Sequence, residues 1–150
     1  MSSDSSKRLM KDFKKIRTDP PPGIVAAPRE GNLYFWDCVI TGVDDTLWED
    51  AVLKLTLEFP QDYPHKPPFA RFVTNVFHPN VFSTGEICID ILRKNWTAAY
   101  DVSSILISIQ ALLTDPNPLA NANPEACQLC LNNITEYEKK VRECVEKSWD

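Results

Sequence analysis

The residues most able to do chemistry in this 150-residue chain lie between positions 76 and 96. Cys88 sits there between two isoleucines, with a His-Pro-Asn triplet at 78–80 and Trp96 eight residues downstream. Gly85 precedes the thiol and predicts a turn, and Asp90 follows it by two residues, near enough to touch a group carried on the sulfur. A cysteine in such a run could be a small buried hydrophobe. The combination instead favours chemistry at the thiol.

One candidate chemistry is a thiol protease dyad of Cys88 and His78. Such a base must reach the sulfur and be oriented by a third group. Pro79 restricts His78 to extended conformations, and the flanking residues are apolar, so a buried ring bonded to the backbone is the stronger prediction. The local cysteine signatures of the protease families are also absent. Hydrolysis is therefore disfavoured.

A second candidate is thioester exchange, which needs a reachable thiolate but no strong base and no metal. When an amine later attacks the thioester, the oxyanion requires a hydrogen-bond donor, and the side-chain amide of Asn80 can serve. The attacking lysine must lose a proton, which desolvation and a carboxylate such as Asp90 assist. Asn80 could instead brace its loop, or do both.

The remaining cysteines point to packing. Cys127 and Cys130 form a C-x-x-C pair, but structural zinc needs four ligands, and the chain has no second pair and only His65 and His78. Five cysteines without a signal peptide indicate free thiols. Cys38 falls on the apolar face of a predicted strand. No metal site is predicted.

Composition is that of one globular domain over residues 1–150, with 43% hydrophobic and 25% charged residues. A net charge of −5 argues against direct nucleic-acid binding. No apolar run reaches the roughly 18 residues of a membrane span, and the N-terminus lacks a signal-peptide core. We therefore expect a protein of the cytoplasm and nucleus, without membrane contact.

Hydrophobic periodicity predicts an α+β fold. An N-terminal helix over 5–18, capped by Asp4 or Ser5, presents a stripe of Leu9, Phe13 and Ile16. Strands are predicted at 33–40, 53–59 and 69–74, with 24–28 short and extended at best. Residues 76–96 should be a long, packed, irregular segment. A central helix begins at Val102, capped by Asp101 or Ser103, and ends before 115–118; two more helices cover 124–131 and 135–149.

The triplet 78–80, the run Gly85-Glu86-Ile87-Cys88-Ile89-Asp90-Ile91-Leu92 and Trp96 resemble the active-site signature of ubiquitin-conjugating enzymes. Segments 19–21, 59–60, 63–64, 66–68 and 115–118 extend the resemblance along nearly the whole chain. It implies a UBC-like fold with a four-stranded antiparallel meander, and a monomer that binds no cofactor, because the activating enzyme consumes the ATP. Segments 7–13, 100–106 and 147–149 resemble a branch that acts in DNA-damage tolerance and histone ubiquitylation.

The resemblance also implies roles for single residues. Cys88 would accept ubiquitin from the activating enzyme and pass it to a substrate lysine. Asn80 would serve the oxyanion or the loop, and Asp90 would lie near the lysine. The surrounding active-site frame would comprise His78, Pro79, Trp96 and Ala120. The activating enzyme would meet Lys7, Arg8 and Lys11. A RING-type ligase would be gripped by Pro64, His65, Lys66, Thr97, Ala98 and Ala99.

The sequence also departs from the family pattern. Ala120 stands where many relatives place an Asp or Ser, so lysine activation should rest more heavily on Asp90 and on the ligase. Ala98 replaces a usual proline in a ligase-binding loop, and His65 leaves the choice of ligase open. Two alternatives remain: a ubiquitin-binding scaffold, which typically lacks the cysteine, and a carrier of another ubiquitin-like modifier.

Overall fold

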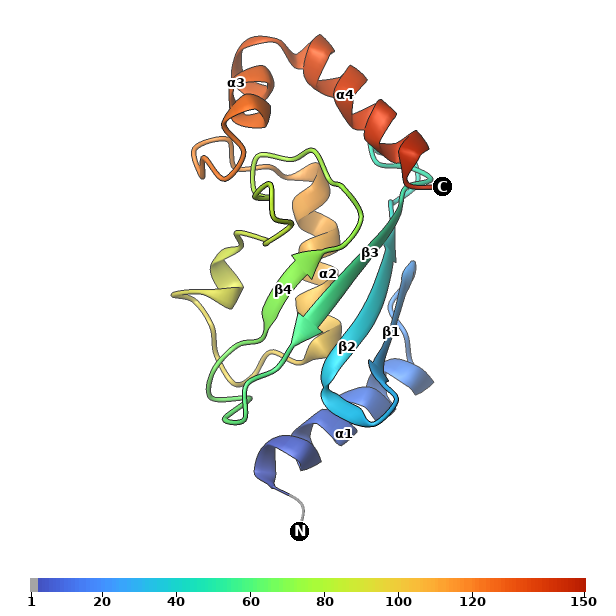
Figure 1. The fold of residues 1–150 in the computed structure, drawn as a ribbon, viewed down its shortest axis with the longest axis vertical. Coiled ribbons are helices and arrows are strands. Elements are labelled where there is room, and N and C mark those ends of the chain that lie inside the picture. The colour runs from blue at the N-terminus through green and yellow to red at the C-terminus, as the bar shows by residue number, and fades with distance from the viewer. Residues whose placement is uncertain (1–2) are drawn as a thin grey trace.

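The computed structural model describes residues 3–150. Its centre is a four-stranded antiparallel meander in the order β1 (Ile24–Arg29), β2 (Asn32–Thr41), β3 (Val52–Glu58), β4 (Phe69–Phe72) (Figure 1). The predicted α+β class is confirmed. Residues 24–28, expected to be short and extended at best, form a paired strand, because β1 pairs with β2 from Ile24 opposite Ile40 onward. As an edge strand, β1 tolerates Pro28, which cannot donate to the ladder.

Alternation along the central strands builds the core. Leu53, Leu55 and Leu57 of β3 are buried, and so are Trp36, Cys38 and Ile40 of β2. Because side chains alternate between the two faces of a strand, these residues share one face of the sheet. The packing role predicted for Cys38 is confirmed, and burial raises the pKa of its thiol to about 12.

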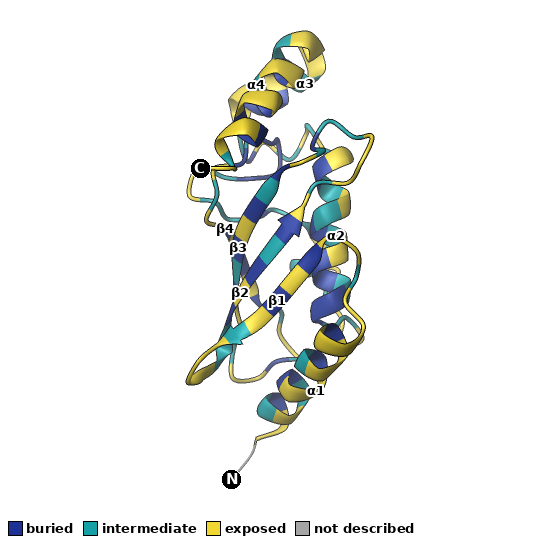
Figure 2. Ribbon diagram, turned by 90° about the vertical axis from the view of Figure 1, so that its right-hand side faces the viewer, coloured by how far each residue is buried: buried dark blue, intermediate teal, exposed yellow. Residues whose placement is uncertain are grey.

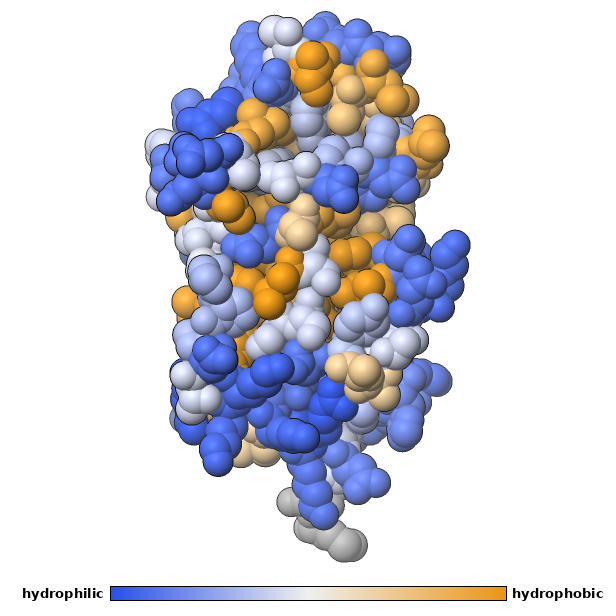
Figure 3. Space-filling view, turned by 180° about the vertical axis from the view of Figure 1, so that it is seen from behind, coloured by the Kyte–Doolittle hydropathy of each residue, from blue (hydrophilic) through white to orange (hydrophobic). Residues whose placement is uncertain are grey.

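Two helices cover that face (Figure 2). Helix α1 (Asp4–Thr18) is capped by Ser3, whose hydroxyl accepts from the Ser6 amide, so the prediction of Asp4 or Ser5 was wrong. Ser5 is instead buried, with its hydroxyl 2.6 Å from that of Tyr34 on β2. Helix α2 (Val102–Thr114) has Asp101 as its cap, one of the two residues predicted. Seen from the helical side, the surface is hydrophilic around α1 and shows apolar patches over its middle (Figure 3).

Helices α3 (Pro124–Asn132) and α4 (Ile134–Lys147) lie beyond one end of the sheet (Figure 1). Helix α4 ends at Lys147 rather than at the predicted position 149, because the next two residues bond to the loop and strand beside them. The Ser148 hydroxyl accepts from the Val52 amide at 3.0 Å, and the Trp149 indole donates to the Asp50 carbonyl at 2.7 Å. The C-terminus is thereby fastened to the start of β3.

Strand β4 ends at Phe72, two residues before the predicted limit, and the chain then enters a segment that is mostly irregular, as predicted. Within this segment, residues 85–88 form backbone hydrogen bonds with β4 on one side and with Asn80 on the other. The Phe72 amide donates to the Gly85 carbonyl and the Ile87 amide to the Ala70 carbonyl. On the other edge the Cys88 amide donates to the Asn80 carbonyl at 2.8 Å. A short hairpin over residues 80–88 therefore extends the sheet, and η1 (Asp90–Leu92) follows it.

Gly85 makes the turn of this hairpin possible. Its φ is +93°, and a Cβ placed there would lie 2.2 Å from the Phe72 carbonyl oxygen. We expect Gly85→Ala to lower the free energy of unfolding by at least about 2 kcal/mol, combining backbone strain with displacement of β4. Urea denaturation measures this loss. Gly31→Ala is the matched control, since Gly31 also has positive φ (+77°) but open space around it. That control should lose only about 1 kcal/mol, and equal losses in the two variants would contradict the assigned clash.

Candidate active site

The hairpin places Cys88 beside Asn80. Val81 bridges Ile87, and both side chains are buried, so Glu86 and Cys88 project to the opposite, outer side of the strand. Cys88 is a free, half-buried thiol. Two residues that are eight apart in sequence are thus joined by one backbone hydrogen bond, and the thiol stands at the surface.

Asn80 joins three segments. Its backbone amide donates to His78 Nδ1 at 3.0 Å, its carbonyl accepts from Cys88, and its side-chain Oδ1 accepts from the Asn117 amide at 2.9 Å. The side chain is only 4% exposed. Within residues 3–150 the other end of the amide, Nδ2, forms no hydrogen bond, and the residue that carries it lies directly opposite Cys88 across the hairpin. Loop bracing, one of the two predicted roles, is therefore present in the structure.

His78 is buried completely and is fixed in one tautomer. Because the Asn80 amide can only donate, Nδ1 accepts, and Nε2 carries the proton that it donates to the Leu112 carbonyl at 2.8 Å. Burial lowers the pKa of His78 to about 4, against the raising effect of its bonds to the backbone at Leu112 and Leu113. With both nitrogens engaged, His78 has no lone pair for the Cys88 proton. The protease dyad is excluded, and the predicted bond from ring to backbone is observed.

Asp90 lies at the surface, at the start of η1. Its backbone carbonyl accepts from the amides of Arg93 and Asn95, which fixes the turn, while its carboxylate has no hydrogen-bond or ion-pair partner among residues 3–150. A free carboxylate thus stands two residues beyond the thiol. A carboxylate with no internal partner is a group that can act as a proton acceptor.

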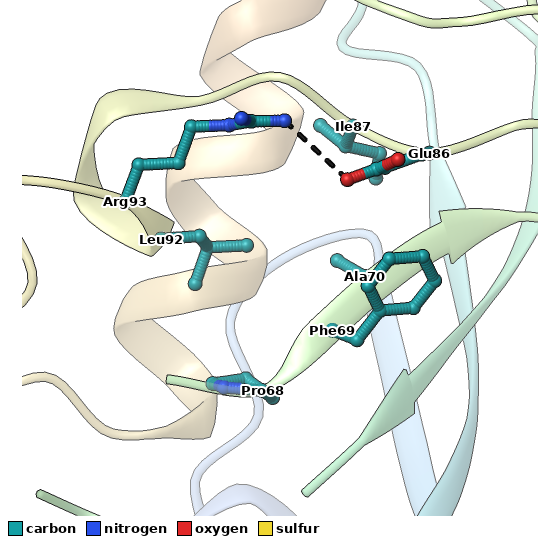
Figure 4. A pocket seen from close by; sticks show the side chains of 7 residues that line it. All are labelled: Pro68, Phe69, Ala70, Glu86, Ile87, Leu92 and Arg93. Atoms are coloured by element: carbon teal, nitrogen blue, oxygen red, sulfur yellow. Dashed lines mark hydrogen bonds and ion pairs between the residues drawn. The ribbon is translucent and has the colours of Figure 1, made fainter. Parts of the chain in front are cut away.

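A shallow hollow borders the site on the β4 side (Figure 4). Arg93 reaches across it to Glu86, with 3.4 Å between Nη2 and Oε1. The remaining lining residues are Pro68, Phe69, Ala70, Ile87 and Leu92. Glu86 shares the outer side of the strand with Cys88, so this ion pair lies beside the reacting face. Both of its side chains are well exposed, and such a pair contributes little to stability.

The turn at 117–120 borders the site on the Asn80 side. The Ala120 amide donates to the Asn117 carbonyl at 3.1 Å, and the Leu119 amide donates to Asn117 Oδ1 at 3.1 Å. Ala120 therefore lies three residues beyond the amide that holds Asn80. The Asn123 amide donates to the Pro79 carbonyl, which also receives the Cys127 thiol at 3.7 Å. The triplet 78–80 is thus held from α2, from this turn and from α3.

Trp96 ties the two predicted ligase-binding loops together. Its indole donates to the Pro64 carbonyl at 3.0 Å, just after the cis Tyr63–Pro64 peptide, and its ring lies against those of Tyr63 and Tyr100. Beside these rings, five of the six predicted contact residues are exposed: His65, Lys66, Thr97, Ala98 and Ala99. The structure therefore brings the two loops into one surface.

Arg8 reaches the same surface from α1. Its guanidinium donates to the carbonyls of Ala98 at 2.9 Å and Tyr100 at 2.8 Å, and pairs with Asp12 at 3.0 Å. The Tyr63 hydroxyl donates to the other Asp12 oxygen at 2.6 Å. Lys7 and Lys11 are exposed to solvent, whereas the Arg8 guanidinium is engaged in these internal contacts.

Sequence reasoning missed three of these features. It treated Asn117 as part of a helix-ending and family motif without a contact to Asn80, it gave Arg8 no internal partner, and it did not consider Leu119. The i,i+4 spacing of Arg8 and Asp12 was an available signal for the ion pair. The contact of Asn117 with Asn80 joins positions 37 apart and has no local signal.

The C-x-x-C pair packs at the base of the site. Cys127 is buried and Cys130 half-buried, and burial, with a smaller effect of Cys127, raises the pKa of Cys130. Across residues 3–150 no group of three or more His, Cys, Asp or Glu side chains could hold a metal ion. Both thiols therefore have the packing role that the sequence favours, Cys127 as a buried side chain and Cys130 as a partly buried one against the core.

Fold and site together define a class: an α+β domain that presents a surface thiol on a short hairpin, opposite an asparagine and two residues before an exposed carboxylate. Comparison with known proteins gives this class a family. The family model described as ubiquitin-conjugating enzyme matches residues 8–145. A Candida glabrata protein named ubiquitin-conjugating enzyme E2 2 is 50% identical over all of this chain and 90% of its own length; its Kluyveromyces lactis namesake is 49% identical over all of this chain and 92% of its own.

The chain therefore belongs to the ubiquitin-conjugating enzyme family and is a transferase that works through a cysteine thioester. Membership implies interaction with ubiquitin, with an activating enzyme and with ligases. None of the helices in residues 3–150 has the length and apolarity to cross a bilayer.

The burial of neutral His78 predicts a pH dependence of stability. An unfolded histidine titrates near pH 6.5, and His78 in the fold near 4, so between these values the unfolded chain binds more protons. We expect the free energy of unfolding to fall as the pH decreases from about 6.5 to about 4, by up to about 3 kcal/mol from this residue. Urea denaturation across this range measures the slope.

The variant His78→Gln should flatten that slope, although it lowers stability at neutral pH. His65→Gln is the matched control, because His65 is exposed and the slope should persist without it. An undiminished slope in His78→Gln would show that other groups produce the pH dependence.

Proposed function

We propose that Cys88 is the cysteine that carries ubiquitin. The observation that supports this most is the hydrogen bond from the Cys88 amide to the Asn80 carbonyl, which holds a half-buried thiol directly opposite Asn80 across the hairpin. Three of the other four cysteines are buried, and the fourth, Cys130, lies on α3. Burial raises the pKa of Cys38, Cys130 and Cys144, which disfavours their thiolates.

In the loading step the Cys88 thiolate attacks the thioester of ubiquitin on the activating enzyme, and the thiolate of that enzyme leaves. In the second step a lysine amine attacks the Cys88 thioester. The tetrahedral oxyanion accepts a hydrogen bond from Asn80 Nδ2, the Cys88 thiolate departs, and an isopeptide bond remains. Asp90 accepts the proton that the amine loses. His78, Pro79 and Trp96 act by holding these groups in place.

The proposed partner surfaces follow from exposure and charge. Lys7 and Lys11 present a basic face on α1 to the activating enzyme, with Arg8 shaping the adjoining loop. The surface around Pro64, His65 and Lys66, with the loop at 97–99, receives a RING-type ligase. The protein acts as a monomer in cytoplasm and nucleus without a bound cofactor, nucleic acid or membrane. The proposed branch of DNA-damage tolerance and histone ubiquitylation rests on segments 7–13, 100–106 and 147–149, which resemble that branch.

Loading onto Cys88 is tested directly. Incubated with ubiquitin, activating enzyme and ATP, the native protein should form an adduct that reductant removes. Cys88→Ser should give a reductant-resistant, alkali-labile ester, because an oxygen ester replaces the thioester. Cys130→Ser, the control at the other half-buried thiol, should still form the thioester. A reductant-sensitive adduct that persists in Cys88→Ser would show that another cysteine carries ubiquitin. Parallel reactions with other ubiquitin-like modifiers test the alternative that the protein carries one of them instead of ubiquitin.

The apolar residue at 120 predicts slow intrinsic transfer. No carboxylate or hydroxyl at that position assists deprotonation of the amine, so discharge of charged enzyme to free lysine should be slow without a ligase. Ala120→Asp should raise the single-turnover rate by about tenfold, below the effect of a fully positioned base. Ala27→Asp, which adds the same charge on the exposed side of β1, should leave the rate as it is. An unchanged rate in Ala120→Asp would contradict the role given to this position.

A further inference from the structure

Leu119 is the most exposed large apolar side chain in residues 3–150, at 83%. A single exposed leucine on a protein surface is ordinary and needs no explanation. This one is unusual in its place, because it is carried by the turn that pins the active-site asparagine.

The backbone at Leu119 is fixed relative to the thiol by a short chain of hydrogen bonds. The Leu119 amide donates to Asn117 Oδ1, the Asn117 amide donates to Asn80 Oδ1, and the Asn80 carbonyl accepts from Cys88. A partner that touches Leu119 therefore gains apolar contact without first ordering this backbone, which lowers the entropic cost of that contact.

The two borders of the site differ in chemistry. Asp90 follows Cys88 along the chain and carries a free carboxylate. In the turn on the Asn80 side, positions 119 and 120 are both apolar, a leucine and an alanine. In the proposed reaction the lysine amine approaches the Cys88 thioester with Asp90 as its proton acceptor. Residues next to that lysine then come within reach of the apolar turn, which Asn117 holds against Asn80.

Resting on the proposed function, we propose that Leu119 is a specificity-determining residue for the acceptor. It contacts an aliphatic side chain next to the substrate lysine, so that lysines with an apolar neighbour are used in preference to lysines with small polar neighbours. The contact is open to solvent on one side. Its effect is therefore smaller than the ten- to hundredfold discrimination of an enclosed apolar pocket, and we expect roughly three- to tenfold.

Single-turnover discharge tests this contact. The native enzyme is charged with ubiquitin and chased with two short peptides that carry one lysine, flanked by leucine in one and by serine in the other. The native rate should be roughly three- to tenfold higher with the leucine-flanked peptide. In Leu119→Ser the ratio of the two rates should approach one, and Leu119→Met should restore it. Leu131→Ser, at an exposed leucine on α3, should keep the native ratio.

The outcomes separate the possible contacts of Leu119. If Leu119 touched the ubiquitin tail instead, Leu119→Ser would change both rates by one factor and leave their ratio intact, which would overturn this inference. A native ratio near one would overturn it as well. In both cases the enzyme would still have formed the ubiquitin thioester, so the proposed function would stand. The absence of any adduct on Cys88 would overturn the proposed function and this inference with it.

Discussion

The three backbone and side-chain hydrogen bonds of Asn80 are the constraint on which the site depends. They join the hairpin that carries Cys88, the histidine buried against α2 and the turn before α3, which are otherwise irregular pieces of chain. A buried amide that lost these partners would leave unpaired polar groups, each costing about 1–3 kcal/mol. The same bonds that satisfy the buried groups also set the distance between thiol and amide, so stability and positioning are inseparable here.

His78 shows how a reactive residue type is made inert. Its two nitrogens are the ends of a bridge between the Asn80 amide and the Leu112 carbonyl, and the bridge requires a neutral ring. Protonating Nδ1 would set a donor against a donor, in a place where burial already disfavours charge. His78, which could be taken for a base from the sequence, therefore has a structural role. The chemistry is left to the thiol, which in thioester exchange needs no base.

Hydrophobic periodicity was sufficient to predict most of the fold, because the buried residues of β2, β3, α2 and α4 recur at regular spacings, as Leu53, Leu55 and Leu57 do. It underestimated β1, since Ala26, Ala27 and Pro28 have weak strand preferences and pairing with β2 supplies the order. The hairpin at 80–88 was read as irregular, because its ladders are only a few bonds long. Residue types and spacing were sufficient to single out Cys88 and Asn80, and the family motif supports the same two residues. Long-range contacts such as Asn117 with Asn80 could not be predicted, since no local pattern encodes them.

The network from α1 to the loops has a consequence for how partners act. Arg8 bonds the loop at 98–100, its ion-pair partner Asp12 bonds Tyr63, and the Tyr63 ring lies against Trp96, whose indole holds Pro64. Asp12 and Tyr63 are almost fully buried, so the coupling passes through groups that no partner touches. A displacement of α1 must break a bond to one loop or carry that loop with it. Trp96 also lies four residues beyond the end of η1, the element that carries Asp90, so this coupled surface and the active-site carboxylate share one short stretch of chain.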